Sequence, residues 1–279
     1  MNKQPYPLSQ ELYLKFREHI KKFSGVSLKS DRRKGFYLRT NSLLKTFKLK
    51  NYNEFYDEII SNQSNSLNTA LLNCVTIDKT SFFRQPYHFH YLEKKLHNHI
   101  IDEIHNSGKY SVLSAGCATG EEAYSIAICL YCSLGPKLAK NISIIAIDIN
   151  TDSLQFAKQG IYSEIALKTF YQDNFKQQVV MQNSFINIKP HIRRMVSFQP
   201  GNLMKKSHKP KQFQLIFCRN VIIYMAKSDQ LIVLSHLYDL LVYSGILFSG
   251  SAESIQLITD QYVGLHPHVY QKQKEGQSE

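Results

Sequence analysis

The sequence predicts an α/β protein in which a mostly parallel sheet is preceded by a small all-α region. Two patterns support this fold class. Up to about Leu72 apolar residues recur at helical spacing, whereas from Tyr110 short apolar runs alternate with helical segments. The 279 residues, 43% of them hydrophobic, also supply enough apolar material for a sizeable core. A disordered chain and a disulfide miniprotein are therefore excluded.

The front of the chain, residues 1–76, is predicted to form a basic domain of three to five short amphipathic helices. Ser9 is a suitable N-cap for the first helix, and Gly25 is a suitable stop. Breaks between helices are expected near residues 24–27 and at the polar cluster 61–66. Residues 77–109 then read as a linker with a helix.

Residues 110–270 are predicted to form the parallel sheet with its crossover helices. The candidate strands are residues 111–115, 142–147, 195–198, 213–217 and 246–249. Helices fit between them at residues 121–134 and 228–242. Residues 165–194 are too many for a simple connection and predict an inserted helix and short β-hairpin. The polar residues 271–279 predict a flexible tail.

The charge is concentrated at the front of the chain. The formal net charge is +12, and residues 1–50 contain thirteen basic and three acidic residues. An acidic protein, a nucleic acid or a membrane surface would each suit such a charge, and a merely solvated helix face is the alternative. The basic side chains expected on the solvent faces include Lys21, Lys22, Arg32, Arg33 and Lys34.

Targeting signals and metal motifs are weak in this sequence. No run of about eighteen apolar residues is present, so no membrane insertion is expected, and residues 1–10 do not resemble a signal peptide. Five scattered cysteines suit a reducing cytoplasm. Cys129 and Cys132 form a CxxC pair without further ligands nearby, so no metal site is predicted.

The loop after the first candidate strand carries the first chemical signal. Gly116 and Gly120 let a ligand approach the backbone at the edge of the sheet where ligands bind. Glu121 and Glu122 open the next helix and would repel a phosphate, which favours a ligand with a cationic amine, such as S-adenosylmethionine, over NAD or ATP. However, glycines after strands are common, and acids at helix starts are also explained by the helix dipole alone.

An acid at the end of the second candidate strand adds to this signal. Asp148 is placed to accept hydrogen bonds from both hydroxyls of a ribose. A role in capping the next helix, beside Asn150 and Thr151, is the alternative.

Four segments in order resemble the motifs of the CheR-type chemotaxis receptor glutamate methyltransferases. They are Thr-Ser-Phe-Phe-Arg at residues 80–84, Ser-Ala-Gly-Cys-Ala-Thr-Gly-Glu-Glu-Ala-Tyr-Ser-Ile at 114–126, Ala-Ile-Asp-Ile-Asn-Thr at 146–151 and Phe-Cys-Arg-Asn-Val-Ile-Ile-Tyr at 217–224. Residues 37–44 and 245–254 extend the resemblance to the family's N-terminal domain and last parallel strand. The resemblance implies a Rossmann-like S-adenosylmethionine-dependent methyltransferase domain.

The resemblance also implies which residues hold the cofactor. Asp78 stands where the family usually has Asn, which exchanges a side chain that donates for one that cannot. Together with the glycine loop, the expected cofactor-binding residues are Asp78, Thr80, Arg84, Gly116, Glu122, Asp148, Asn202, Leu203, Arg219 and Asn220. Tyr224 matches a tyrosine near the transferred methyl, with simple packing as its alternative, and the catalytic candidates are Tyr224 and Arg84.

The implied reaction needs no catalytic base. A glutamate carboxylate, with a pKa of about 4.3, is already ionised at neutral pH and attacks a sulfonium methyl directly. Tyr224 or Arg84 would orient the substrate or cofactor carboxylate, and Arg84 is assigned mainly to the cofactor. The implied partner is the cytoplasmic helical coiled coil of chemoreceptors, whose acidic face would meet the basic helices of a monomeric enzyme. In some relatives the inserted hairpin also grips a receptor tail peptide.

Two other functions stay open at the level of sequence. A nucleic-acid methyltransferase would suit a basic chain, although the Asn-Pro-Pro-Tyr type of motif is absent after the fourth strand and no nucleic acid is expected. A cofactor-binding sensor that has lost catalysis is supported only by Asp78.

Overall fold

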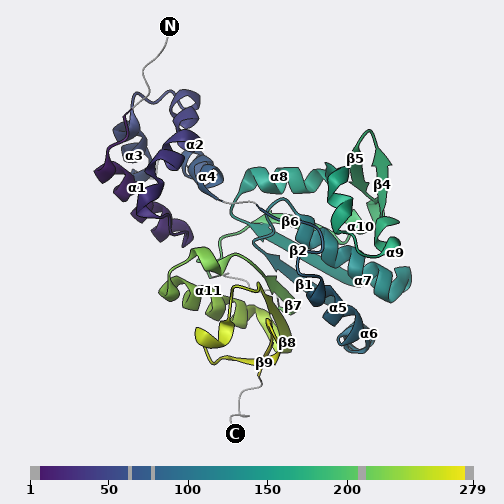
Figure 1. Cartoon of the computed structure of the whole chain (residues 1–279). Coiled ribbons are helices and arrows are strands. Elements are labelled where there is room, and N and C mark those ends of the chain that lie inside the picture. Colours follow the sequence, from purple (N-terminus) through teal and green to yellow (C-terminus); the bar gives the residue numbers. More distant parts are fainter. Residues whose placement is uncertain (1–6, 62–64, 77–78, 207–211, 274–279) are drawn as a thin grey trace.

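The computed structural model describes residues 7–61, 65–76, 79–206 and 212–273. Figure 1 shows a helical domain, formed by the front of the chain, beside an α/β domain. Its elements among the described residues are α1 (Gln10–Ser24), the 3₁₀ turn η1 (Ser30–Arg32), α2 (Arg33–Thr46), α3 (Tyr52–Ile60) and α4 (Asn65–Val75). Four helices agree with the three to five that the periodicity predicts.

Local sequence signals define the first helix as predicted. The Ser9 side chain accepts a hydrogen bond from the amide of Leu12 at 3.1 Å, and Gly25 ends the helix in the left-handed region with φ +76°. Helix α4 begins at Asn65, inside the polar cluster expected to break the helices, and residues 62–64 of that cluster lie outside the described residues. The helices pack around a separate aromatic core that includes Phe16, Phe36 and Phe55.

The α/β domain is built on a seven-stranded sheet with the order β6-β2-β1-β7-β8-β10-β9. Neighbouring strands from β6 to β8 are parallel, and β10 and β9 are antiparallel. The strands are β1 (Tyr110–Ala115), β2 (Ile142–Asp148), β6 (Val196–Pro200), β7 (Phe213–Cys218), β8 (Leu241–Ser249), β9 (Tyr262–His266) and β10 (Val269–Lys272). Helices α5 (Pro86–Lys94) and α6 (His97–Ser107) precede the sheet, and α7 (Glu121–Ala139), α8 (Thr151–Gln159), the 3₁₀ turn η3 (Ile222–Tyr224), α11 (Lys227–Leu240) and the 3₁₀ turn η4 (Ile255–Leu257) connect its strands.

The five predicted parallel strands are present, with bounds that differ by one or two residues except at the start of β8, which begins five residues earlier than predicted. The helix predicted to reach residue 242 ends at Leu240, because Leu241 is fully buried and pairs with Phe213 as the first residue of β8. The β9–β10 hairpin was not predicted. Strand β10 includes Lys272, which the sequence placed in a flexible tail, and its ammonium donates to the carbonyls of Tyr238 and Leu241.

The inserted subdomain begins earlier than predicted, at β3 (Ile161–Ser163). It continues through the 3₁₀ helix η2 (Glu164–Thr169), α9 (Asp173–Lys176), β4 (Val179–Gln182), β5 (Phe185–Ile188) and α10 (Pro190–Arg193). Strands β4 and β5 form the expected hairpin, and β3 adds to it in an antiparallel sheet ordered β3-β5-β4.

The topology brings several loops to one edge of the main sheet. The chain passes from β1 outward to β2 and β6 and then returns to β7 on the other side of β1, so the strand order reverses between β1 and β7. Ligands of open α/β sheets bind at such a reversal, outside the carboxyl ends of the strands. Within the described ranges, no helix has the length and apolar character needed to cross a membrane.

Candidate functional site

A pocket with a cavity volume of about 150 Å³ lies between the two domains and is called the interdomain pocket below. Its walls come from residues 24–28 after α1, from the end of α4, and from the loops that follow β1, β2, β6 and β7. Most of the lining is apolar, including Val26, Ile147 and Leu203, and Asp148 is the only charged residue among the described residues of the lining. The pocket therefore suits a flat, mostly apolar ligand without phosphates.

Asp148 ends β2 and is held by the neighbouring backbone. Its carboxylate accepts hydrogen bonds from the amides of Ala118 and Asn150, both at 2.8 Å. Both carboxylate oxygens are thus oriented by the loops after β1 and β2. The capping role considered as the alternative belongs instead to Asn150, whose side chain accepts from the amides of Asp152 and Ser153.

Glycine is required where the loops after β1 and β7 meet. Gly116 has φ +79°, and a Cβ atom there would come within 2.3 Å of Val221 Cγ2. The amide of Gly116 donates to the carbonyl of Ile147 at 2.8 Å, which fixes this loop against the end of β2. Any larger residue would push the two loops apart and distort both walls of the pocket.

The helical domain is attached to the pocket walls through side-chain and backbone hydrogen bonds. The side-chain Nδ2 of Asn202 donates to the carbonyl of Phe23 at 2.7 Å, and the backbone amide of Ser27 donates to the carbonyl of Tyr224 at 2.9 Å. A single antiparallel bridge joins Val26 to Met225. The end of α1 and the segment after it thus form one wall of the pocket and contact two of the predicted site residues.

A second, smaller pocket of about 40 Å³ adjoins the first and is called the network pocket below. It shares Gly116, Ala118 and Asn220 with the interdomain pocket and adds Lys79, Thr80, Ser81, Arg84, Glu122 and Arg219. Unlike the interdomain pocket, it therefore contains both acidic and basic side chains. That combination suits a zwitterionic ligand group such as an amino acid.

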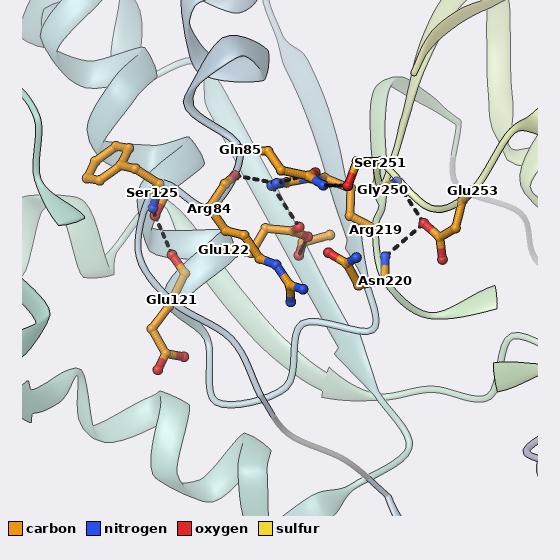
Figure 2. A network of polar contacts seen from close by, with 12 residues as sticks. Arg84, Gln85, Glu121, Glu122, Ser125, Arg219, Asn220, Gly250, Ser251 and Glu253 are labelled. Carbon is orange, nitrogen blue, oxygen red and sulfur yellow. Dashed lines mark hydrogen bonds and ion pairs between the residues drawn. The ribbon is translucent and has the colours of Figure 1, made fainter. Parts of the chain in front are cut away.

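Buried charges line this network pocket (Figure 2). The guanidinium of Arg219, whose side chain is 2% exposed, lies 3.3 Å from the carboxylate of Glu122. It also donates to the carbonyl of Arg84 and to the side chain of Gln85. Burial raises the pKa of Glu122, and Arg219 and a 2.7 Å hydrogen bond from Ser114 partly offset that effect. Burial likewise lowers the pKa of Arg219.

The two acids at the start of α7 face different surroundings. Glu122 lines the network pocket, whereas Glu121 accepts a hydrogen bond from the Thr119 hydroxyl at 2.6 Å and is not part of either lining. The residue after them, Ala123, is buried in the core. Glu122, and not its neighbour, therefore lines the network pocket.

The remaining predicted site residues lie around the two pockets or on the surface. Thr80 and Arg84 line the network pocket, with Arg84 exposed and donating to the carbonyl of Lys79 at 3.1 Å. Tyr224 lines the interdomain pocket and is 41% exposed, so its ring is not simply packed in the core. Asp78 lies outside the described residues. The predicted docking residues are all exposed: Lys21, Lys22, Arg32, Arg33 and Lys34.

Two residues that hold the pocket walls through hydrogen bonds were missed by the sequence reasoning. Gln85, next to the predicted Arg84, accepts from Arg219 and donates to the Ser251 hydroxyl at 2.6 Å. Glu253 is 2% exposed and accepts hydrogen bonds from the loop that follows β7. Glu253 follows the end of β8 by four residues, and nothing near it in the sequence indicates the amides that it binds, which lie about thirty residues earlier.

A family model and the most similar sequence relatives agree on one family. The family model for "CheR methyltransferase, SAM binding domain" matches residues 78–268. The chemotaxis protein methyltransferase of Escherichia coli is 30% identical over 273 residues, 96% of this chain and 93% of the relative. That of Salmonella typhimurium is 31% identical, over 86% of this chain and 82% of the relative. Among solved structures, the N-methyltransferase NodS from Bradyrhizobium japonicum with S-adenosyl-L-homocysteine matches 65% of this chain and 87% of its own, with 15% identity and a TM-score of 0.37.

Proposed function

Since this chain belongs to the CheR methyltransferase family and has its S-adenosylmethionine-binding domain, we propose that it methylates glutamate side chains of bacterial chemoreceptors. The products would be glutamyl methyl esters and S-adenosylhomocysteine. The observation that supports this most strongly is the pairing of two pockets at the strand-order reversal. Among the described residues, Asp148 is the charged residue that lines the interdomain pocket, and the network pocket is lined by charges of both signs.

The donor set of the two pockets fits S-adenosylmethionine. Asp148 would accept hydrogen bonds from the ribose hydroxyls, and the apolar walls that include Ile147 and Leu203 would cover the adenine. In the network pocket, Glu122 would face the cationic amine, and Arg84 would face the carboxylate. The cations of the network pocket, Lys79, Arg84 and Arg219, lie beside the carboxylate of Glu122, and Asp148 lines the interdomain pocket, so each lining holds an acid that would repel a phosphate.

The chain's own residues would act by positioning and by excluding water. When bound, the cofactor supplies a methyl group activated by a sulfonium. A glutamate carboxylate with a pKa of about 4.3 needs no base to attack it. Tyr224, at the rim of the interdomain pocket, would orient the substrate carboxylate. The buried ion pair of Glu122 and Arg219 is already formed within the protein itself. These protein charges would therefore need little rearrangement during methyl transfer.

The partner proposed for the basic helical domain is the acidic helical region of a receptor. Lys21 and Lys22 lie at the exposed end of α1, and Arg32, Arg33 and Lys34 lie at the exposed start of α2. Long-range attraction between these cations and an acidic coiled coil would raise the rate of encounter more than the final affinity. The same segment of chain leads from α1 into the wall of the interdomain pocket, so docking and catalysis would occur on one side of the protein.

Methyl labelling tests this function directly. The protein is incubated with S-adenosylmethionine labelled in its methyl group and with membranes that contain chemoreceptors. We expect base-labile label on the receptors, and no label when the receptor glutamates are replaced by alanine. Asp148→Ala serves as the matched enzyme variant and should lose most of the label. Label on added RNA with none on the receptors would contradict the proposal.

A further inference from the structure

A buried carboxylate outside both pockets is bonded to the loop that carries the predicted catalytic tyrosine. Glu253, in the turn that follows β8, is 2% exposed. One oxygen accepts from the amides of Val221 at 2.8 Å and Ile223 at 3.3 Å. The other accepts from the amides of Asn220 at 2.8 Å and Gly250 at 2.7 Å. Four backbone donors therefore converge on one side chain, as Figure 2 shows in part.

We infer that Glu253 is a positioning residue that fixes the loop of residues 219–224 in the shape required for cofactor binding and methyl transfer. This inference rests on the proposed function, because that loop supplies Asn220 to both pockets and Tyr224 to one of them. Glu253 itself is not among the residues that line either pocket. It would act only through the loop.

An external anchor would hold the turn that this loop makes. Asn220 has φ +59°, in the left-handed region that most non-glycine residues rarely adopt but that asparagine adopts more readily. The amides of the residues that follow it have no strand partner at this turn and are satisfied by the carboxylate instead. Bonds from three successive parts of the loop to a single group hold it against relaxation to an extended conformation.

The anchor is itself fixed in place. The amide of Glu253 donates to the carbonyl of Gly250 at 2.9 Å, and the hydroxyl of Ser249 donates to the carbonyl of Glu253 at 2.7 Å. A Cβ atom at Gly250 would lie 2.6 Å from the Glu253 carboxylate and 2.8 Å from the Asn220 amide. The close approach of the two turns therefore depends on glycine at this position.

Four N–H donors at one side chain are best matched by a carboxylate, because both of its oxygens accept hydrogen bonds. A carboxylate accepts at both oxygens and has no hydrogen to place against an amide, whereas glutamine would direct an NH₂ group at two N–H donors. Aspartate retains the charge but is one methylene shorter, so it cannot reach all four amides at once. Glu253→Gln and Glu253→Asp thus test the requirement for charge and the requirement for reach.

Calorimetric binding of S-adenosylhomocysteine tests the positioning role of Glu253 without a methyl acceptor, so its result does not depend on which protein is methylated. We expect Glu253→Gln to raise the dissociation constant at least about tenfold and Glu253→Asp to raise it about threefold. The matched control is Glu93→Gln in α5, a half-buried acid that accepts from Gln172 away from both pockets. The control should bind within about twofold of the wild type.

Kinetics with the methyl acceptor then distinguish positioning from a general loss of stability. We expect Glu253→Asp to lower kcat and raise KM for S-adenosylmethionine, while KM for the receptor stays within about twofold. If the Gln variant fails to fold, the Asp variant provides the test. Folded Glu253 variants that bind and turn over like the wild type would overturn the inference. A wild type that binds the cofactor product but methylates no receptor would instead contradict the proposed function.

Discussion

The two pockets differ in how their walls are held. The network pocket is fixed within the α/β domain by a buried ion pair and by hydrogen bonds among Arg219, Glu122 and Gln85. One wall of the interdomain pocket belongs to the helical domain, which is attached by uncharged hydrogen bonds near Phe23 and Ser27 and between Asn73 and Thr151. We conclude that the network pocket, which depends on buried charges, is rigid and costly to alter, whereas the uncharged hydrogen bonds between the domains are less costly to lose, and that substitutions should rank accordingly.

The largest effect is expected for Arg219→Met. The change leaves Glu122 buried without its partner and removes the donors to Arg84 and Gln85. The free energy of unfolding should fall by about 3–5 kcal/mol, as is typical when one member of a buried pair is removed. Urea denaturation measures it. Arg193→Met, at an exposed arginine that donates to the carbonyl of Lys158, should change stability by less than about 1 kcal/mol. Equal losses in both variants would contradict a rigid network pocket.

Asp148→Ala should have the next largest effect, this time on cofactor binding. Asp148 is the charged residue of the interdomain lining, and its loss also frees the amides of Ala118 and Asn150. Removing hydrogen bonds to a charged group costs about 1.5–3 kcal/mol, which is about 10- to 100-fold in the dissociation constant of S-adenosylhomocysteine. In the same calorimetric titration Glu121→Ala should change it less than about threefold. The reverse order would refute both assignments.

A pH profile tests the charge of the network pocket. Because burial raises the pKa of Glu122, its carboxylate becomes protonated at a higher pH than an ordinary glutamate does. Protonation removes the negative charge that would face the cofactor amine, so affinity for S-adenosylhomocysteine should fall by about tenfold as the pH drops through this pKa. Calorimetry between about pH 8 and pH 5 follows the change.

Two variants test whether Glu122 is the group that causes this pH dependence of binding. Glu122→Gln should bind weakly at every pH and show a flat profile. Glu93→Gln removes another acid whose pKa is raised by burial, but it lies outside both pockets and should keep the wild-type profile. An unchanged slope in Glu122→Gln would show that another group titrates.

Features of the fold could be predicted from the sequence where they depend on interactions between residues close together in the chain. Ser9 and Gly25 act on their own helix, and the apolar runs of the parallel strands are contiguous, so both were predictable. The β9–β10 hairpin was missed because its short strands are stabilised by the pairing of β10 with β8. No local sequence pattern indicates that pairing. Glu253 was missed for a related reason, since the amides it binds lie about thirty residues earlier in the chain.

For the site, motif matching identified side chains but not what holds them. Asn202 was expected beside the adenine, and it does line the interdomain pocket. Its amide is nevertheless occupied by contacts to Phe23 and Met204, one of them in the other domain. Such a contact spans most of the chain and depends on how the domains pack, which sequence periodicity does not describe.

The smallest effect is expected at this contact between the domains. Asn202→Asp keeps an oxygen for the amide of Met204, at 3.0 Å in the wild type, but loses the donor to the carbonyl of Phe23. One such hydrogen bond contributes about 0.5–1.5 kcal/mol, so the dissociation constant of S-adenosylhomocysteine should rise about threefold to tenfold. If the bond to Phe23 is what matters, Asn202→Ala should weaken binding by a similar amount. If instead only Asn202→Ala binds weakly, the hydrogen bond from the amide of Met204 is the one that matters. The pocket would then depend less on the helical domain than we infer.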